Sequence, residues 1–154
     1  MRIAVGCDHR GLKLKQQVLE ILTAAGHSYN DVGCYSEEPV DYPDIARYVA
    51  VTVADEKCDM GIVICSTGIG VSIAANKVKG IRAALCCDTF SAQRSRQHND
   101  ANVMCLSAGI KEPLLKEMIP AFLEGKFEGG RHQRRVEKIT AMAVSYTHLR
   151  AHET

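Results

Sequence analysis

A cysteine stands immediately before a glycine-containing loop, where Cys65 is followed by Ser66-Thr67-Gly68-Ile69-Gly70. The loop joins an apolar run to a helical pattern, so its backbone amides could form a nest for an anionic oxygen. The same dipoles favour a thiolate and lower the pKa of a free cysteine, about 8.5, toward neutrality. A thiolate beside an oxyanion cradle could move a proton next to a carbonyl group. A plain tight turn beside a buried structural cysteine is the alternative that these residues leave open.

Two further groups could take part in such chemistry. His98 and Asn99 are adjacent where a helical pattern ends, and they could supply a proton donor and an amide partner. A histidine at a helix C-terminus is also favourable simply as a positive charge. Arg131 and Arg135 are four residues apart, so on a helix they share one face, as a bidentate phosphate clamp requires. For these two arginines, a solvated basic face is the alternative.

Short apolar runs alternate with longer helical patterns, which predicts an α/β fold with a parallel sheet and helices on its faces. The predicted strands are residues 3–7, 28–32, 61–65, 81–86 and 103–106. The predicted helices begin near residues 14, 44, 71, 88, 113 and 129. Because the chain shows no repeat, linker or low-complexity tract, we expect residues 1–143 to form one domain.

Ligands of open parallel sheets bind beyond the carboxyl ends of the strands. Asp8 and His9 follow the first predicted strand, residues 65–70 follow the third, Asp88 follows the fourth, and residues 98–100 precede the fifth. We therefore expect all four polar clusters at this edge of the sheet.

Composition excludes several classes of function. The chain has 154 residues, 46% of them hydrophobic, so it can bury a core without a disulfide or a metal. Its net charge of +1 provides no overall field that would favour nucleic acid or an anionic membrane. The seven cysteines contain no C-x-x-C pair, which argues against a disulfide framework and a common zinc site. No run approaches the roughly 18 apolar residues of a membrane span. Since the N-terminus leads directly into a motif, we expect a cytoplasmic protein.

The last eleven residues, VSYTHLRAHET, are similar in every position to the translation of a transposon-type sequencing adapter. We therefore interpret residues 144–154 as a non-native tail produced by read-through, and exclude them from the fold prediction.

Several segments taken together indicate a protein family more specifically than any of these groups does alone. They are Gly6-Cys7-Asp8-His9, Asp41-Tyr42-Pro43 and residues 64–70, 72–77, 80–83, 91–93, 95–103 and 128–136. Through them, the chain from Arg2 to about Met142 resembles the type B ribose-5-phosphate isomerases. Galactose-6-phosphate isomerase subunits share the broader family, but His98-Asn99 and Gly129-Gly130-Arg131-His132 resemble the ribose enzymes more closely.

The resemblance implies a Rossmann-like, doubly wound, five-stranded parallel sheet with helices on both faces and a C-terminal helix. It also implies a homodimer or dimer of dimers with the site between subunits. The implied reaction is a step of the pentose phosphate pathway, the interconversion of ribose 5-phosphate and ribulose 5-phosphate, without a metal or cofactor and without nucleic acid or membrane partners.

Catalytic roles carried over from the family fall on four residues. Cys65 would be the base that moves a proton between C2 and C1 through an enediolate. Thr67 and His98 would assist opening of the sugar ring, and Asp8 would handle hydroxyl protons.

Binding roles carried over from the family fall on a larger set of residues. The enediolate oxygen would be held by Asn99 and by the backbone of Gly68, Ile69, Gly70, Val71 and Ser72. The phosphate would be bound by His9, Arg131 and Arg135, and Tyr42 would line the pocket.

Two departures from the family pattern affect the expected substrate. Ser66 stands where the family has glycine after the catalytic cysteine, and Gly109 stands where the family has an arginine for phosphate. Lys111 could substitute, but a flexible ammonium does not reproduce the fork of a guanidinium. Isomerisation of allose 6-phosphate or galactose 6-phosphate is therefore the alternative activity, and a non-catalytic phosphosugar-binding module is the alternative of a different class.

Overall fold

The computed structural model describes the backbone of residues 1–153 and the side chains of residues 1–143. The segment predicted to be a non-native tail, residues 144–154, lies outside the residues whose side chains are described. Among the described residues, no helix combines the length and the apolar character needed to cross a bilayer.

A single sheet of five parallel strands forms the centre of the molecule. The strands are β1 (Arg2–Cys7), β2 (Ser28–Asp31), β3 (Met60–Cys65), β4 (Ala83–Leu85) and β5 (Val103–Ser107), in the order β2-β1-β3-β5-β4. Every residue of β3 is buried, as in strands that are covered on both faces. The predicted five-stranded parallel sheet is therefore confirmed.

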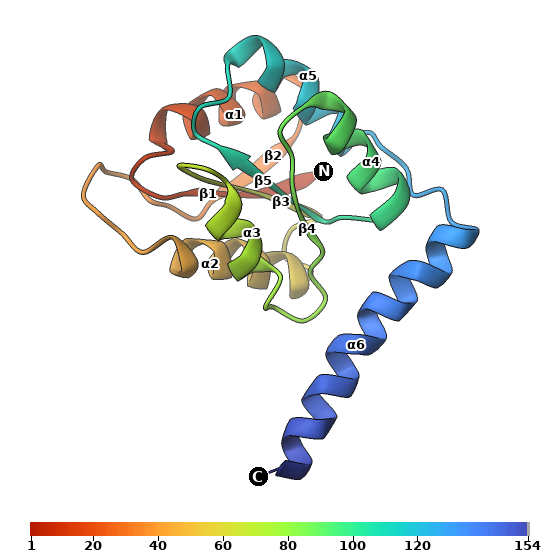
Figure 1. Ribbon diagram of the computed structural model, residues 1–154. Helices are drawn as coiled ribbons and strands as arrows, with labels where there is room; N and C mark the ends of the chain where they lie inside the picture. Colours follow the sequence, from red (N-terminus) through yellow and green to blue (C-terminus); the bar gives the residue numbers. More distant parts are fainter. Residues whose placement is uncertain (154) are drawn as a thin grey trace.

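Helices cover both faces of this sheet (Figure 1). On one face lie α1 (Leu12–Ala24), α4 (Thr89–Asn99) and α5 (Glu112–Leu123), and on the other lie α2 (Tyr42–Ala54) and α3 (Ile69–Ala75). The last helix, α6 (Arg131–Glu153), contacts α4 and extends away from the sheet. The doubly wound arrangement with a C-terminal helix is thus confirmed.

Local signals explain where several elements begin and end. Asp88, one of the two cap residues that the sequence allows together with Thr89, caps α4 through a reciprocal capping box in which its side chain accepts from the Ser91 amide at 2.6 Å. By contrast, β4 is shorter than the predicted 81–86. The amide of Arg82 donates to the Asn102 side chain at 2.8 Å, so it takes no part in the ladder, and β4 begins only at Ala83, which pairs with Val103.

The chain leaves β1 and β3 toward opposite faces of the sheet. These strands are neighbours, with Cys7 opposite Ile64, yet β1 leads to α1 on one face and β3 to α3 on the other. In open parallel sheets, such a switch point opens a crevice beyond the carboxyl ends of the two strands. Asp8 and the loop 66–70 lie at this point.

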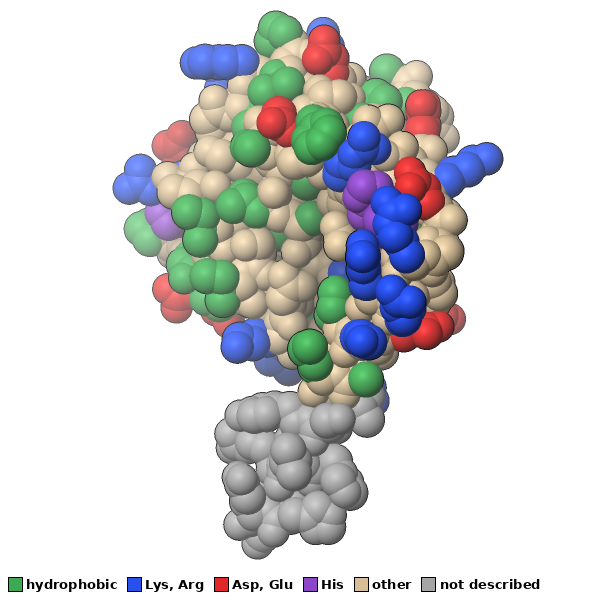
Figure 2. Space-filling model, turned by 45° about the vertical axis from the view of Figure 1, so that its right-hand side comes forward, with side chains coloured by type: hydrophobic (Ala, Val, Ile, Leu, Met, Phe, Trp, Pro, Cys, Tyr) green, Lys and Arg blue, Asp and Glu red, His purple; other side chains and the backbone are tan. Residues whose placement is uncertain are grey.

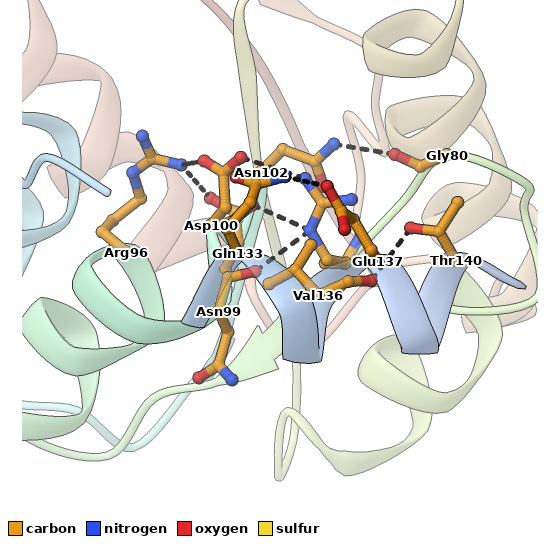
Figure 3. Close-up of polar contacts among 11 residues, drawn as sticks. Gly80, Arg96, Asn99, Asp100, Asn102, Gln133, Val136, Glu137 and Thr140 are labelled. Carbon is orange, nitrogen blue, oxygen red and sulfur yellow. Dashed lines mark hydrogen bonds and ion pairs between the residues drawn. The ribbon is translucent and has the colours of Figure 1, made fainter. Parts of the chain in front are cut away.

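The expectation that residues 98–100 lie at the same edge is wrong. Because α4 runs back from the carboxyl end of β4, its last residues lie at the amino end of β5. Cys65 pairs with Ser107 at the far end of β5, and a strand of that length separates its ends by roughly 13 Å. Figure 3 shows Asn99 and Asp100 at this opposite edge, where Arg96 bonds to Asp100 at 3.0 Å.

Candidate active site

Asp8 and Cys65 emerge side by side from the sheet at the β1–β3 switch point. Both side chains are buried, each with 5% of its surface exposed. The Asp8 amide donates to the Ile64 carbonyl at 3.1 Å, and its carboxylate accepts from the Arg10 amide at 3.0 Å. A carboxylate and a thiol therefore share one wall of a cleft of about 380 Å³.

The loop after Cys65 turns a backbone amide toward the sulfur. The amide of Gly68 donates to Cys65 Sγ at 3.2 Å, and the amide of Ile69 donates to Thr67 Oγ1 at 3.1 Å. Gly68 has a left-handed φ of 79°, which favours glycine. A Cβ atom there would lie 2.7 Å from Leu85 Cδ1 and 2.9 Å from the Leu106 carbonyl carbon. Conformation and close packing together therefore require glycine at this position.

Two amides in the first turn of α3 have no acceptor in the part of the chain that the structure describes, and of these two residues Gly70 lines the cleft whereas Val71 is fully buried. The amides of Gly70 and Val71 have no acceptor among the described residues, as is usual for the first turn of a helix. The amide of Ser72 donates instead to the Gly68 carbonyl at 3.2 Å. Within the predicted oxyanion cradle of residues 68–72, Gly70 and Val71 are thus the two free donors.

Ser107 links the loops that follow β3 and β5. Its hydroxyl donates to the Ser66 carbonyl at 2.8 Å and accepts from the Gly109 amide at 3.1 Å. The Ala108 amide also donates to the Cys65 carbonyl at 2.9 Å. The role of Ser107 in joining these two loops was not predicted from the sequence. The signal that could have found it is the pairing of β3 with β5, which places Ser107 opposite Cys65 at the ends of the two strands.

Side chains from three elements complete the cleft. Tyr42 at the start of α2 packs its ring so closely on Gly70 that a Cβ there would lie 2.5 Å from the ring. Ile69 and Ile73 of α3 line the opening, as does Arg10 from the loop after Asp8. Arg10 was missed by sequence analysis, although it stands two residues after the predicted Asp8.

His9 lies beside the cleft without being one of the residues that line it. Its Nδ1 accepts from the Val40 amide at 3.2 Å. The neutral ring therefore carries its proton on Nε2, which is left as a donor for an anion.

The remaining predicted residues form a second group on α4 and α6. The rings of His98 and His132 stack with centroids 4.1 Å apart, and Arg131 and Arg135 are exposed on α6. Burial lowers the pKa of His132, and the neighbouring His98 and Arg131 lower it further. Figure 2 shows Lys and Arg side chains grouped around a histidine on one face of the molecule. This basic group has the charge to bind phosphate.

The structure thus divides the predicted site residues between two places. Asp8, Tyr42, Cys65, Thr67 and residues 68–72 lie together at the carboxyl edge. His98, Asn99, Arg131 and Arg135 lie near the amino edge of the same chain, so one subunit alone does not assemble the predicted site.

Other cysteines have environments that keep them as thiols. Burial raises the pKa of Cys7 to about 12 and that of Cys86 to about 11, and it also raises the pKa of Cys105. These side chains behave as small core residues, as expected. Cys65 differs from them in accepting an amide hydrogen bond at the wall of a cleft.

Substitution of Gly68 tests the geometry of the loop. We expect Gly68→Ala to lower kcat by about 100-fold or more, because the displaced loop loses donors that are each worth about 3 kcal/mol in related oxyanion sites. Gly80→Ala is the matched control, since Gly80 has a similar φ of 88° and no atom near its Cβ position. Steady-state kinetics and thermal unfolding of both variants provide the measurement. Equal kcat in the two variants would contradict the role of the loop.

The chain is similar to known proteins over most of its length. A model of the family described as Ribose/Galactose Isomerase matches residues 3–139. The chain is 49% identical over 142 residues to ribose-5-phosphate isomerase B of Escherichia coli, covering 92% of this chain and 95% of the relative. It is 45% identical over 145 residues to D-erythrulose-4-phosphate isomerase of Pectobacterium atrosepticum, covering 90% and 93%.

A solved structure gives the same result for the fold. Ribose-5-phosphate isomerase B of Clostridium thermocellum is 44% identical and superposes with a TM-score of 0.92, covering 95% of this chain and 99% of that one. Sequence and fold therefore agree over nearly the whole chain, which belongs to the ribose/galactose isomerase family.

Proposed function

We propose that this protein interconverts ribose 5-phosphate and ribulose 5-phosphate without a metal or cofactor, as a cytoplasmic enzyme of the pentose phosphate pathway. The observation that carries the proposal is the position of Cys65. Its sulfur accepts a hydrogen bond from the Gly68 amide in the same cleft as the Asp8 carboxylate and Gly70, whose amide has no acceptor among the described residues. The name of the Escherichia coli relative supports the choice of substrate.

The cleft has the groups needed for an enediolate mechanism. The Cys65 thiolate takes the proton from C2 of the open-chain aldose, and the electron pair moves through C1 to the carbonyl oxygen O1. Asp8 transfers the O2 proton to O1, and the Cys65 thiol returns its proton to C1, which leaves a ketone at C2. The amide of Gly70, which lines the cleft, would face the charge that develops on oxygen. Prepositioned donors of this kind contribute about 3 kcal/mol each.

A homodimer would complete this site. Ring opening and phosphate binding are assigned to His98, Asn99, Arg131 and Arg135, which lie near the opposite edge of the same chain. We infer that this second group of one subunit serves the cleft of its partner. Holding the phosphate there would fix the reacting carbons against Cys65.

Exposed apolar side chains around the cleft support association. Tyr42, Tyr48 and Val51 of α2 and Ile69 and Ile73 of α3 are each more than a third exposed. Tyr48 and Val51 also line a second cleft of about 520 Å³ on the same helix. A concentration of apolar surface at the rim of a site is typical of an interface.

A steady-state assay tests the proposed activity. The full chain and a chain ending at residue 143 are compared on ribose 5-phosphate in the presence of EDTA, and we expect equal turnover. Allose 6-phosphate, galactose 6-phosphate and erythrulose 4-phosphate are measured in parallel. Preference for one of these sugars would replace the proposed substrate. Binding without turnover of any of them would favour a non-catalytic phosphosugar-binding module.

Gly109 leaves a hexose phosphate as the second candidate substrate, because the resemblance places an arginine for phosphate at this position. Gly109 is exposed, and a Cβ would meet only Ser107 Oγ at 3.5 Å, so an arginine fits. We expect Gly109→Arg to lower the KM for ribose 5-phosphate about tenfold, the effect of one charge-assisted hydrogen bond. Gly109→Gln is the uncharged control. An unchanged KM would mean that Lys111 or another cation already fills this role.

A further inference from the structure

Three potential metal ligands converge where α4 meets the start of α6. The ligand atoms of His98, Glu128 and His132 all lie within 4.8 Å of one another. Glu128 Oε1 is 3.5 Å from His98 Nε2 and 3.7 Å from His132 Nε2. Both distances exceed the 2.7–3.2 Å or so of a hydrogen bond between nitrogen and oxygen. The carboxylate therefore lies within ion-pair distance of both imidazoles without a normal hydrogen bond to either.

The backbone before α6 holds these residues together. Gly129 and Gly130 have left-handed φ values of 69° and 57°, a turn that favours glycine at both positions. The Glu128 amide donates to the Gln97 carbonyl at 3.0 Å, and the His132 amide donates to the Gly129 carbonyl at 3.0 Å. The first bond holds Glu128 beside Gln97, the residue before His98. The second bond, within the turn at the start of α6, holds His132 close to Glu128.

A buried nitrogen in this cluster has no hydrogen-bond partner among the described residues. His132 is 6% exposed, and its Nε2 makes no hydrogen bond. Buried polar atoms are normally paired, so an unpaired one requires an explanation such as an ion. Nε2 of His132 is also the atom closest to the Glu128 carboxylate on that ring, and it is therefore directed into the cluster.

We propose that His98, Glu128 and His132 form a binding site for a divalent transition-metal ion of the zinc class. Two imidazoles and a carboxylate, with a fourth position open, are a ligand set that Zn²⁺ accepts. Bonds of about 2.0–2.1 Å in a tetrahedral site place the ligand atoms roughly 3.3 Å apart, close to the separations between Glu128 and each histidine.

Binding requires the histidine rings to turn. They are now stacked with only 9° between their planes, whereas both nitrogen lone pairs must point at one ion. The His98 side chain is 33% exposed and has room to rotate. Arg131 and Arg135 stand beside the cluster and repel a cation, so the ion is held more weakly than in a structural zinc site and EDTA removes it.

The effect of a bound ion on activity rests on the proposed function. An ion that holds His98 takes away the residue assigned to ring opening, and therefore inhibits the isomerase. His98 would then take part in catalysis when the cluster is free of metal, and would be a ligand of the inhibitory ion when the ion is bound.

Calorimetric titration with Zn²⁺ tests binding independently of activity. The metal-free full chain carries His148→Gln and His152→Gln in every sample, so that the terminal histidines do not contribute. We expect one ion per chain, with affinity at least tenfold lower in His132→Gln and in Glu128→Gln. His27→Gln is the matched control outside the cluster, and Cys65→Ala removes the competing thiol. Undiminished affinity in the first two variants, or loss of binding in Cys65→Ala, would overturn the site.

An activity assay tests inhibition separately. The rate of each protein is measured with and without Zn²⁺ and after addition of EDTA. We expect inhibition of the chain that has the intact cluster, reversal by EDTA, and at least tenfold weaker inhibition in Glu128→Gln relative to its own zinc-free rate. Saturating zinc without loss of rate in an active enzyme would overturn the inhibitory role. If the protein turns over no sugar phosphate, the titration still decides whether the metal site exists.

Discussion

Cys65→Ala is expected to reduce kcat for ribose 5-phosphate by about 1000-fold, while the affinity for the phosphosugar stays within a few-fold of the original. A positioned base contributes roughly 10²–10⁴-fold to proton transfer, and alanine cannot accept the C2 proton. Phosphate binding is assigned to other side chains, those of His9, Arg131 and Arg135, so the ground-state complex persists. Loss of rate without loss of binding is the expected result for a group that acts in the transition state.

Steady-state kinetics and calorimetric titration with ribose 5-phosphate measure the two quantities separately. Cys87→Ala is the matched control, because Cys87 is the exposed cysteine of the seven and lies outside the cleft. We expect its kcat and KM to be unchanged. A Cys65→Ala variant with full turnover would refute the assignment of the base. A variant that lost binding and turnover together would indicate a structural role for the thiol.

The sheet and the cleft at its carboxyl edge could be predicted because the signals are local. Residues 61–65 form a continuous apolar run, and all of them are buried in the central strand. Cys65 ends that run, so its place at the edge follows from the strand itself. The preference of Asp88 for a helix start is equally local, and its capping box was predictable.

The position of His98 could not be read from the strands alone. It depends on the direction of α4, which returns the chain to the amino edge before β5. Ser107 and Arg10 were missed because their roles arise between segments: Ser107 reaches the Ser66 carbonyl from a neighbouring strand. Glu128 and His132 were not predicted as ligands, because a pair four residues apart is not a site by itself and the third residue, His98, is contributed by another helix.

The separation of the two groups within one chain leads to the second large effect, which is recovery of activity from two inactive variants. Cys65→Ala breaks the carboxyl-edge group, and His98→Ala breaks the group on α4 and α6. If each active site takes one group from each subunit, a mixed dimer contains one site with both defects and one with neither. Neither variant alone can form an intact site.

Random exchange of subunits makes about half of the dimers mixed, each with one intact site of two, so about a quarter of the wild-type activity should return. Two affinity tags allow the mixed dimers to be isolated, and those should reach about half of the wild-type activity. Cys65→Ala mixed with Gly68→Ala is the control, because both changes affect the same group and no intact site results. Isolated Cys65→Ala and His98→Ala mixed dimers that remained inactive would show that the two groups do not serve one site across an interface. Recovery only in this pair would establish that the cleft at the β1–β3 switch point is completed by the α4 and α6 residues of the partner subunit.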